Sequence, residues 1–186
     1  MTPKQCRIIH RWGATPNDDW YQTVGEQLKL QGYQVDIPQM PNTDYPNLEQ
    51  WVAHLQKLVP NPNENTVLIG HSIGVLTILH YINRLNTQQK VGNIVTVAGW
   101  FHLQNLEGPE EEKLAQSWIE VPLDFDKIKK STFTIVSLFS DNDPYVPTSE
   151  EEHFKDKLGA TTFLKHNKGH FTVKEDAQII MQLVEA

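Results

Sequence analysis

A serine within a G-x-S-x-G motif has the clearest chemical potential in this sequence. The motif, Gly70-His71-Ser72-Ile73-Gly74, follows a short apolar run and leads into an apolar helical segment that ends near Leu85. In such a strand–turn–helix setting the serine lies at the tip of a sharp turn with its Oγ exposed, and the glycines let strand and helix approach closely. We therefore predict that Ser72 is a nucleophile and that the Ile73 amide, at a helix start, donates to an oxyanion.

A serine hydroxyl is a weak nucleophile until a base removes its proton and an acid orients that base. The expected chain order is serine, then aspartate or glutamate, then histidine. Asp141 and Asp143 follow the strand predicted over Phe133 to Phe139. Pro144 fixes the turn, which resembles loops in which the second aspartate faces the histidine. Asp143 is therefore favoured as the acid, and Asp141 is the competing candidate, with the alternative role of bonding its own turn.

Two histidines compete for the role of general base. His166 and His170 both follow the strand predicted over Thr161 to Leu164, and His166 is nearer to it. Gly169 gives His170 a flexible loop position, which favours His170. The other six histidines are assigned no chemical role, and none forms an H-E-x-x-H motif, so no metal site is predicted.

Short β-type runs alternate with helical-period segments along the chain. Such alternation implies βαβ crossovers and a mostly parallel sheet covered on both faces, so we expect a three-layer α/β/α sandwich with six strands. Residues 1–186 are expected to form one domain with a short lid-like insertion at about 100–121. The predicted strands are Cys6 to His10, Tyr33 to Ile37, Thr66 to Ile69, Val91 to Val97, Phe133 to Phe139 and Thr161 to Leu164. The predicted helices are Asp19 to Gln31, Leu48 to Val59, the segment after the serine turn, one opening at Gly108-Pro109, Asp124 to Lys130, one after Ser149, and Val173 to Val184.

Two further loops at the strand ends supply candidate site residues. The second oxyanion donor is expected from the loop after the first strand, and the backbone amide of Trp12 is the candidate. Trp100 and Phe101 leave the end of the fourth strand, where they are candidates for an acyl pocket or partial lid. Equally, Trp100 and Trp118 are suited to packing the insertion onto the sheet.

Composition excludes several classes of protein. The 186 residues carry 16 basic and 23 acidic side chains, a formal net charge of −7, without a basic cluster, so nucleic acid and anionic membrane are poor partners. The single cysteine allows neither an intramolecular disulfide nor a four-thiolate zinc site. No apolar run reaches about 18 residues, and the N-terminal residues lack a signal-peptide pattern. We expect a soluble, cytoplasmic protein.

At these residues the chain resembles the α/β-hydrolase superfamily and, more narrowly, the small serine hydrolases grouped with a retinoblastoma-binding protein. The resemblance rests on Asp19-Trp20-Tyr21, on Leu68-Ile69-Gly70-His71-Ser72, on Asp143-Pro144 and on Gly169-His170-Phe171. It implies a triad of Ser72, Asp143 and His170 and a compact sheet in the order 2-1-3-4-5-6. The chain departs from related hydrolases in one respect, because it has His10-Arg11 where they often carry His-Gly. Arg11 is therefore a candidate for binding an acidic substrate, and a solvent-facing arginine is the plainer interpretation.

The predicted activity is acyl transfer to water from a small ester or amide, without a metal or organic cofactor. The alternative is a hydrolase-fold binding or scaffold protein without significant turnover, because a fold by itself does not prove activity. Nothing in the sequence supports a protein partner.

Overall fold

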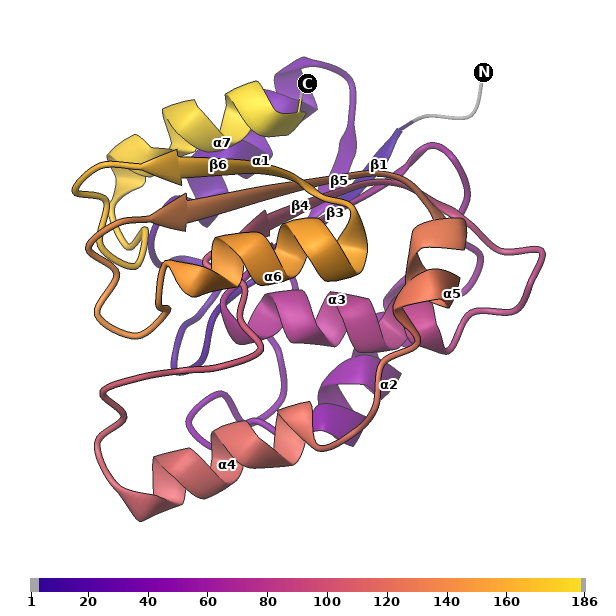
Figure 1. Ribbon diagram of the computed structural model, residues 1–186. Coiled ribbons are helices and arrows are strands. Elements are labelled where there is room, and N and C mark those ends of the chain that lie inside the picture. Colours follow the sequence, from indigo (N-terminus) through magenta and orange to yellow (C-terminus); the bar gives the residue numbers. More distant parts are fainter. Residues whose placement is uncertain (1–3, 185–186) are drawn as a thin grey trace.

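The computed structural model describes residues 4–184, which build a six-stranded sheet between two layers of helices (Figure 1). The strand order is 2-1-3-4-5-6 and every neighbouring pair is parallel, which confirms the predicted α/β/α architecture and topology. The strands are β1 (Gln5–Ile9), β2 (Gln34–Asp36), β3 (Thr66–His71), β4 (Val91–Val97), β5 (Thr132–Ser140) and β6 (Thr161–Lys165).

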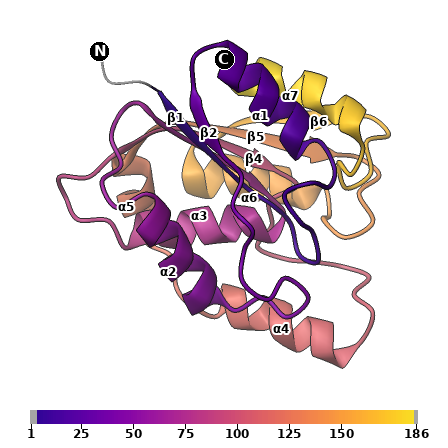
Figure 2. The same cartoon turned by 180° about the vertical axis from the view of Figure 1, so that it is seen from behind.

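The helices divide between the two faces of the sheet. They are α1 (Tyr21–Leu30), α2 (Leu48–Leu58), α3 (Ile73–Asn83), α4 (Pro109–Ile119), α5 (Phe125–Lys130), α6 (Ser149–Leu158), the short 3₁₀ helix η1 (Lys174–Asp176) and α7 (Ala177–Val184). Helices α1 and α7 pack against each other on one face, and α2, α3, α5 and α6 cover the other (Figures 1 and 2). The helix predicted from Val173 begins later, because residues 174–176 form a 3₁₀ turn before α7.

The centre of the molecule is apolar on every side. All six residues of β3 are buried, as are ten of the eleven residues of α3. A strand covered on both faces and a helix enclosed by neighbours have no face turned to solvent, which explains why their sequences are mostly apolar, with the few polar side chains such as His71 and His80 buried too. Cys6 lies in this core on β1, and burial raises the pKa of its thiol to about 12, so it packs as an apolar side chain.

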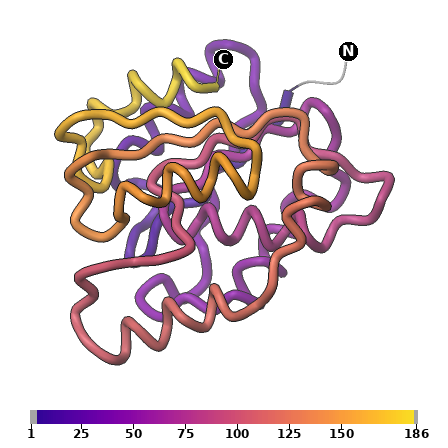
Figure 3. The backbone as a smooth tube through the Cα atoms, viewed as in Figure 1, coloured from indigo at the N-terminus to yellow at the C-terminus, as the bar shows by residue number. Residues whose placement is uncertain are grey.

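The carboxyl ends of the parallel strands meet at one edge of the sheet, so the loops that follow them are neighbours. The longest excursion leaves β4, forms α4 at the far side of α2 and returns through α5 to β5 (Figures 2 and 3). Trp118 anchors α4, because its ring is fully buried edge-on against Trp51 and its indole donates to the Pro46 carbonyl. Trp118 thus has a packing role. No helix within residues 4–184 is long and apolar enough to cross a bilayer.

Candidate active site

Ser72 occupies a sharp turn between β3 and α3. Its backbone has φ 54° and ψ −119°, a conformation that side-chain-bearing residues seldom adopt and that stores strain. The flanking glycines make the turn possible. A Cβ on Gly70 would lie 2.8 Å from the amide nitrogen of Val75, and a Cβ on Gly74 would press on the carbonyl oxygen of Ile9. The structure therefore has the elbow geometry that the motif predicts.

The Ser72 hydroxyl accepts a hydrogen bond from the Trp100 indole at 3.3 Å, so its own proton remains available to a base. Two backbone amides nearby have no acceptor among the described residues. One is the Ile73 amide, which belongs to the first turn of α3, and the other is the Trp12 amide. By contrast, the Arg11 amide donates to the Tyr21 hydroxyl at 3.1 Å. The amides of Ile73 and Trp12 are therefore free to donate to a ligand.

Asp143 and His170 form a buried pair. The His170 Nδ1 lies 2.8 Å from Asp143 Oδ2, and the side chains are 10% and 1% exposed. The other carboxylate oxygen, Oδ1, accepts the backbone N–H groups of Tyr145 and Val146. These bonds fix the carboxylate, which in turn holds the Nδ1–H tautomer of His170 and directs its Nε2 away from the acid. The structure brings together the two residues that the sequence analysis favoured.

The competing candidates, Asp141 and His166, form a pair of their own at the surface. Their side chains are 35% and 79% exposed, and the carboxylate also accepts the Asn167 amide. That backbone hydrogen bond and the His166 contact lower the pKa of Asp141. Among the described residues neither lines the cavity that contains Ser72. Asp141 bonds the neighbouring β6 loop in addition to ending β5, so the predicted purely local role is too narrow.

A chain of hydrogen bonds supports the His170 loop from below. His71 Nε2 donates to the His170 carbonyl at 2.8 Å, which leaves Nδ1 to accept from the Tyr21 hydroxyl at 2.7 Å. Burial, with the nearby His170, lowers the pKa of His71 well below its ordinary value, so this imidazole stays neutral. The Trp20 indole donates to the Phe171 carbonyl in the same loop. The His170 loop is thus held by residues at the start of the first helix and in the serine motif.

Arg11 is held by an acidic neighbour. Its guanidinium makes two hydrogen bonds to Asp19, at 2.8 and 3.3 Å, and a third to the Trp12 carbonyl. Burial by itself would lower the pKa of Arg11, but the Asp19 carboxylate outweighs that effect and raises it. The charge of the guanidinium is therefore largely balanced within the protein, although Arg11 lies at the wall of the cavity.

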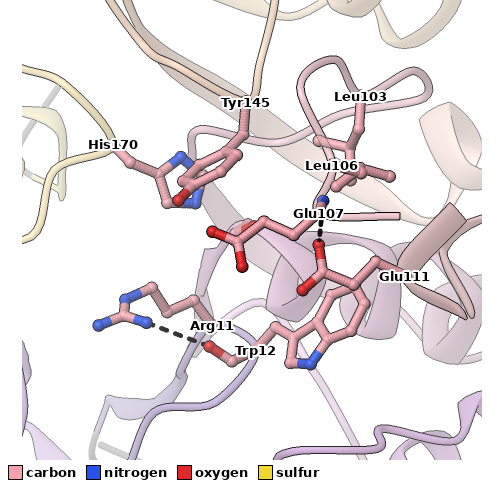
Figure 4. Close-up of a pocket in the computed structure, with 9 residues that line it drawn as sticks. Arg11, Trp12, Leu103, Leu106, Glu107, Glu111, Tyr145 and His170 are labelled. Atoms are coloured by element: carbon pink, nitrogen blue, oxygen red, sulfur yellow. Dashed lines mark hydrogen bonds between the residues drawn. The ribbon is translucent and has the colours of Figure 1, made fainter. Parts of the chain in front are cut away.

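A cavity of about 250 Å³ opens above the serine. Figure 4 shows the side chains that surround it, which come from the loops after β1, β4, β5 and β6 and from α4. Its lining residues are Arg11, Trp12, Ser72, Leu103, Leu106, Glu107, Glu111, Tyr145 and His170. Within this structure no hydrogen bond joins Ser72 to His170, although both line the cavity; such bonds are often long before substrate binds.

Phe101 does not line this cavity, so the structure does not support its predicted place in substrate binding. Its ring packs on Phe125 and Phe154 and lines a separate depression on the α5–α6 side. Trp100 points the other way, toward Ser72, because successive residues of an extended chain face opposite sides.

Several site residues were not singled out from the sequence. Tyr21 and His71 lie in segments that were recognised, but their bond to each other joins positions 50 residues apart. Glu111 belongs to the acidic run Glu110-Glu111-Glu112, whose pattern is that of a solvated helix start, and Glu107 lies in the loop just before it. Tyr145, next to Pro144, packs edge-on against His170 with ring centroids 5.4 Å apart, and its place after the acidic turn was an available signal.

Comparison with known proteins agrees with this geometry. A family model described as serine hydrolase matches residues 6–182. The chain belongs to the serine hydrolase family. The putative hydrolase YdeN of Bacillus subtilis (strain 168) is 30% identical over 173 residues, covering 92% of this chain and 88% of that protein. The serine hydrolase RBBP9 of Rattus norvegicus is 27% identical over 169 residues, covering 90% and 86%.

Solved structures share the fold of this serine hydrolase. The crystal structure of the ydeN gene product from B. subtilis has a TM-score of 0.87 with 26% identity, covering 98% of this chain and 97% of that one. Est1E from Butyrivibrio proteoclasticus has a TM-score of 0.73 with 14% identity, covering 99% and 87%, a likeness of fold alone. The resemblance to α/β-hydrolases is confirmed.

Proposed function

We propose that this serine hydrolase cleaves small esters or amides through an acyl-enzyme on Ser72, with His170 as general base and Asp143 orienting it. His170 Nε2 takes the hydroxyl proton as Oγ attacks the substrate carbonyl, and then gives it to the leaving group. Water enters next, losing a proton to His170, and its attack releases the acid and regenerates Ser72. The Asp143 carboxylate stabilises the imidazolium at both stages.

The observation that carries this proposal is the buried Asp143–His170 bond beside a strained serine in one cavity. The Asp143 carboxylate is enclosed and its second oxygen accepts two backbone amides, so its orientation stays fixed during turnover. The free amides of Ile73 and Trp12 are the proposed oxyanion donors, each worth about 3 kcal/mol in the transition state.

The cavity suits a small, uncharged or positively charged substrate. Its volume of about 250 Å³ is below the range of about 300–1,000 Å³ that is typical of drug-sized ligands, which favours short acyl groups. Leu103 and Leu106 supply apolar wall, and the segment that carries them acts as the proposed partial lid. Two carboxylates, Glu107 and Glu111, face an arginine that Asp19 already neutralises. The excess negative charge at the cavity disfavours an acidic substrate. Arg11 is therefore not the binding group for an acidic substrate that the sequence suggested.

Labelling with a fluorophosphonate probe tests the activated serine. We expect the wild-type protein to be labelled and Ser72→Ala to be unlabelled while its far-UV circular dichroism is unchanged. A folded wild-type protein that resists the probe would contradict the proposal and favour a binding protein without turnover.

Substrate charge is tested with two short esters that differ in an ammonium or a carboxylate on the acyl chain. The cationic ester should have a kcat/KM about tenfold higher, since like charges in a partly enclosed site repel. Replacing both glutamates (Glu107→Gln with Glu111→Gln) should bring the kcat/KM values of the cationic and anionic esters closer together. A wild-type preference for the anionic ester would contradict this part of the proposal.

A further inference from the structure

Three potential metal ligands gather where the loop after β4 meets α6. Glu150 and His153 are the second and fifth residues of α6, and His102 lies in the loop after β4. Glu150 Oε1 is 2.9 Å from the Nδ1 of His102 and 2.9 Å from the Nδ1 of His153. The three ligand atoms all lie within 4.8 Å of one another.

The cluster combines a fixed, buried carboxylate with accessible imidazoles. The Glu150 side chain is 0% exposed, whereas those of His102 and His153 are 60% and 38% exposed. The other carboxylate oxygen, Oε2, accepts the Phe101 amide, which holds the group in place. Because residues three apart on a helix share a face, Glu150 and His153 present their ligand atoms together. An ion thus has an approach from solvent and a preformed anchor.

We propose that His102, Glu150 and His153 form a binding site for Zn²⁺ or a similar first-row divalent cation. Two imidazole nitrogens and one carboxylate oxygen are a ligand set that zinc uses, with bonds of about 2.0–2.2 Å and a fourth position left to water. Ligands at that distance in a tetrahedron are about 3.3 Å apart. The observed carboxylate–imidazole separations of 2.9 Å are close to that value, and all three ligand atoms lie within 4.8 Å of one another.

Binding also has a simple proton balance. Without metal, each Nδ1–H donates to Glu150 Oε1; the metal takes the Nδ1 lone pair, and the imidazole proton then resides on Nε2. No proton is lost from a neutral imidazole in this exchange.

A bound ion would join the β4 loop to α6. The loop continues from His102 to Leu103 and Leu106, which line the cavity above Ser72, and Trp100, two residues earlier, donates to the Ser72 hydroxyl. The metal would therefore stiffen one wall of that cavity without touching the proposed triad. The site itself does not depend on the proposed reaction.

Isothermal titration calorimetry of untagged, chelator-treated protein tests the site. We expect wild-type protein to bind one equivalent of Zn²⁺ and no Mg²⁺, because Mg²⁺ prefers an octahedral shell of oxygens. His102→Ala and His153→Ala should each weaken zinc binding about 100-fold or more, since loss of even an outer-shell partner of a ligand costs about 10- to 100-fold. His54→Ala, a partly buried histidine of α2, is the matched control and should bind as wild type does.

A second measurement is independent of the calorimetric signal. Zn²⁺ should raise the melting temperature of wild type and of His54→Ala, and leave those of His102→Ala and His153→Ala unchanged. The proposal is overturned if wild type shows no saturable zinc binding. In that case the cluster is only an ion pair between Glu150 and the two histidines. The proposal is equally overturned if zinc binds His102→Ala and His153→Ala as tightly as wild type.

Discussion

Two aspartate–histidine pairs join the same two loops of this protein and differ in burial. Asp143–His170 and Asp141–His166 each link the end of β5 to the loop after β6, and each uses Nδ1 against a carboxylate oxygen. The first pair is 1% and 10% exposed and faces the serine, whereas the second is 35% and 79% exposed and faces solvent. The two pairs have the same residue types and nearly the same separation in sequence. The difference in burial therefore determines which aspartate can hold its histidine in one orientation. Water screens the outer pair and is excluded from the inner one.

The largest expected effect separates the two histidines. His170→Ala should lower kcat by about 10⁶-fold and abolish fluorophosphonate labelling, because no group is left to take the serine proton. His166→Ala should keep kcat within about twofold of wild type, since an exposed ion pair constrains little. Steady-state hydrolysis of a short ester measures both. Comparable decreases in kcat in His170→Ala and His166→Ala would show that burial does not separate the functions of the two pairs.

The next effect separates the two acids. Asp143→Asn should lower kcat by about 10⁴-fold with a small change in KM, because the amide favours the wrong imidazole tautomer and cannot stabilise its positive charge. Asp141→Asn should leave kcat near the wild-type value. Equal activity of Asp143→Asn and wild type would remove Asp143 from the mechanism.

A smaller effect is expected at His71, which contacts the backbone of His170 and not the substrate. His71→Gln weakens support for the His170 carbonyl and should lower kcat by about 10- to 100-fold while KM changes little, as for a modest misplacement of a reacting group. His80→Gln is the matched control, because His80 is also buried and also donates to a carbonyl, that of Trp118, away from the cavity. If both replacements lowered kcat alike, the loss would reflect stability and not positioning.

The smallest effect is on stability and its pH dependence. Burial lowers the pKa values of His10, His71 and His80 in the folded protein, so the unfolded chain binds more protons as pH falls through about 6.5. The free energy of unfolding should therefore decrease from pH 7 to pH 5, as measured by urea denaturation. His80→Gln should flatten part of this slope. Asp141→Asn should not alter it, because the Asn167 amide and His166 lower the pKa of Asp141, away from this pH range.

Much of the fold follows from local pattern. The apolar runs of β3 and β4 and the helix stops at Gly32 and Pro60 locate the elements to within a few residues. Parallel pairing then places the loop residues at one edge of the sheet. Pro144 and Gly169 were sufficient to favour the inner pair over the outer one, because turn chemistry is a local property.

Other site features depend on contacts that a single sequence does not display. The neutralisation of Arg11 by Asp19 joins two loop residues eight apart whose approach is set by the turn between them. His71 meets the His170 carbonyl across 99 positions. Phe101 was assigned to the wrong side of its loop, because the direction of alternate side chains depends on where β4 ends and Ala98 turns, with φ 48°.

The bond from the Trp20 indole to the Phe171 carbonyl spans 151 positions, and the helices on that face, α1 and α7, come from the two ends of the fold. During synthesis α1 emerges first, and its helix partner on that face of the sheet is absent until α7 has been translated. Ribosome-bound nascent chains that end before β6 lack both the base and the cover for α1. The onset of serine labelling during synthesis would accordingly report when β6, the His170 loop and α7 have joined the folded sheet.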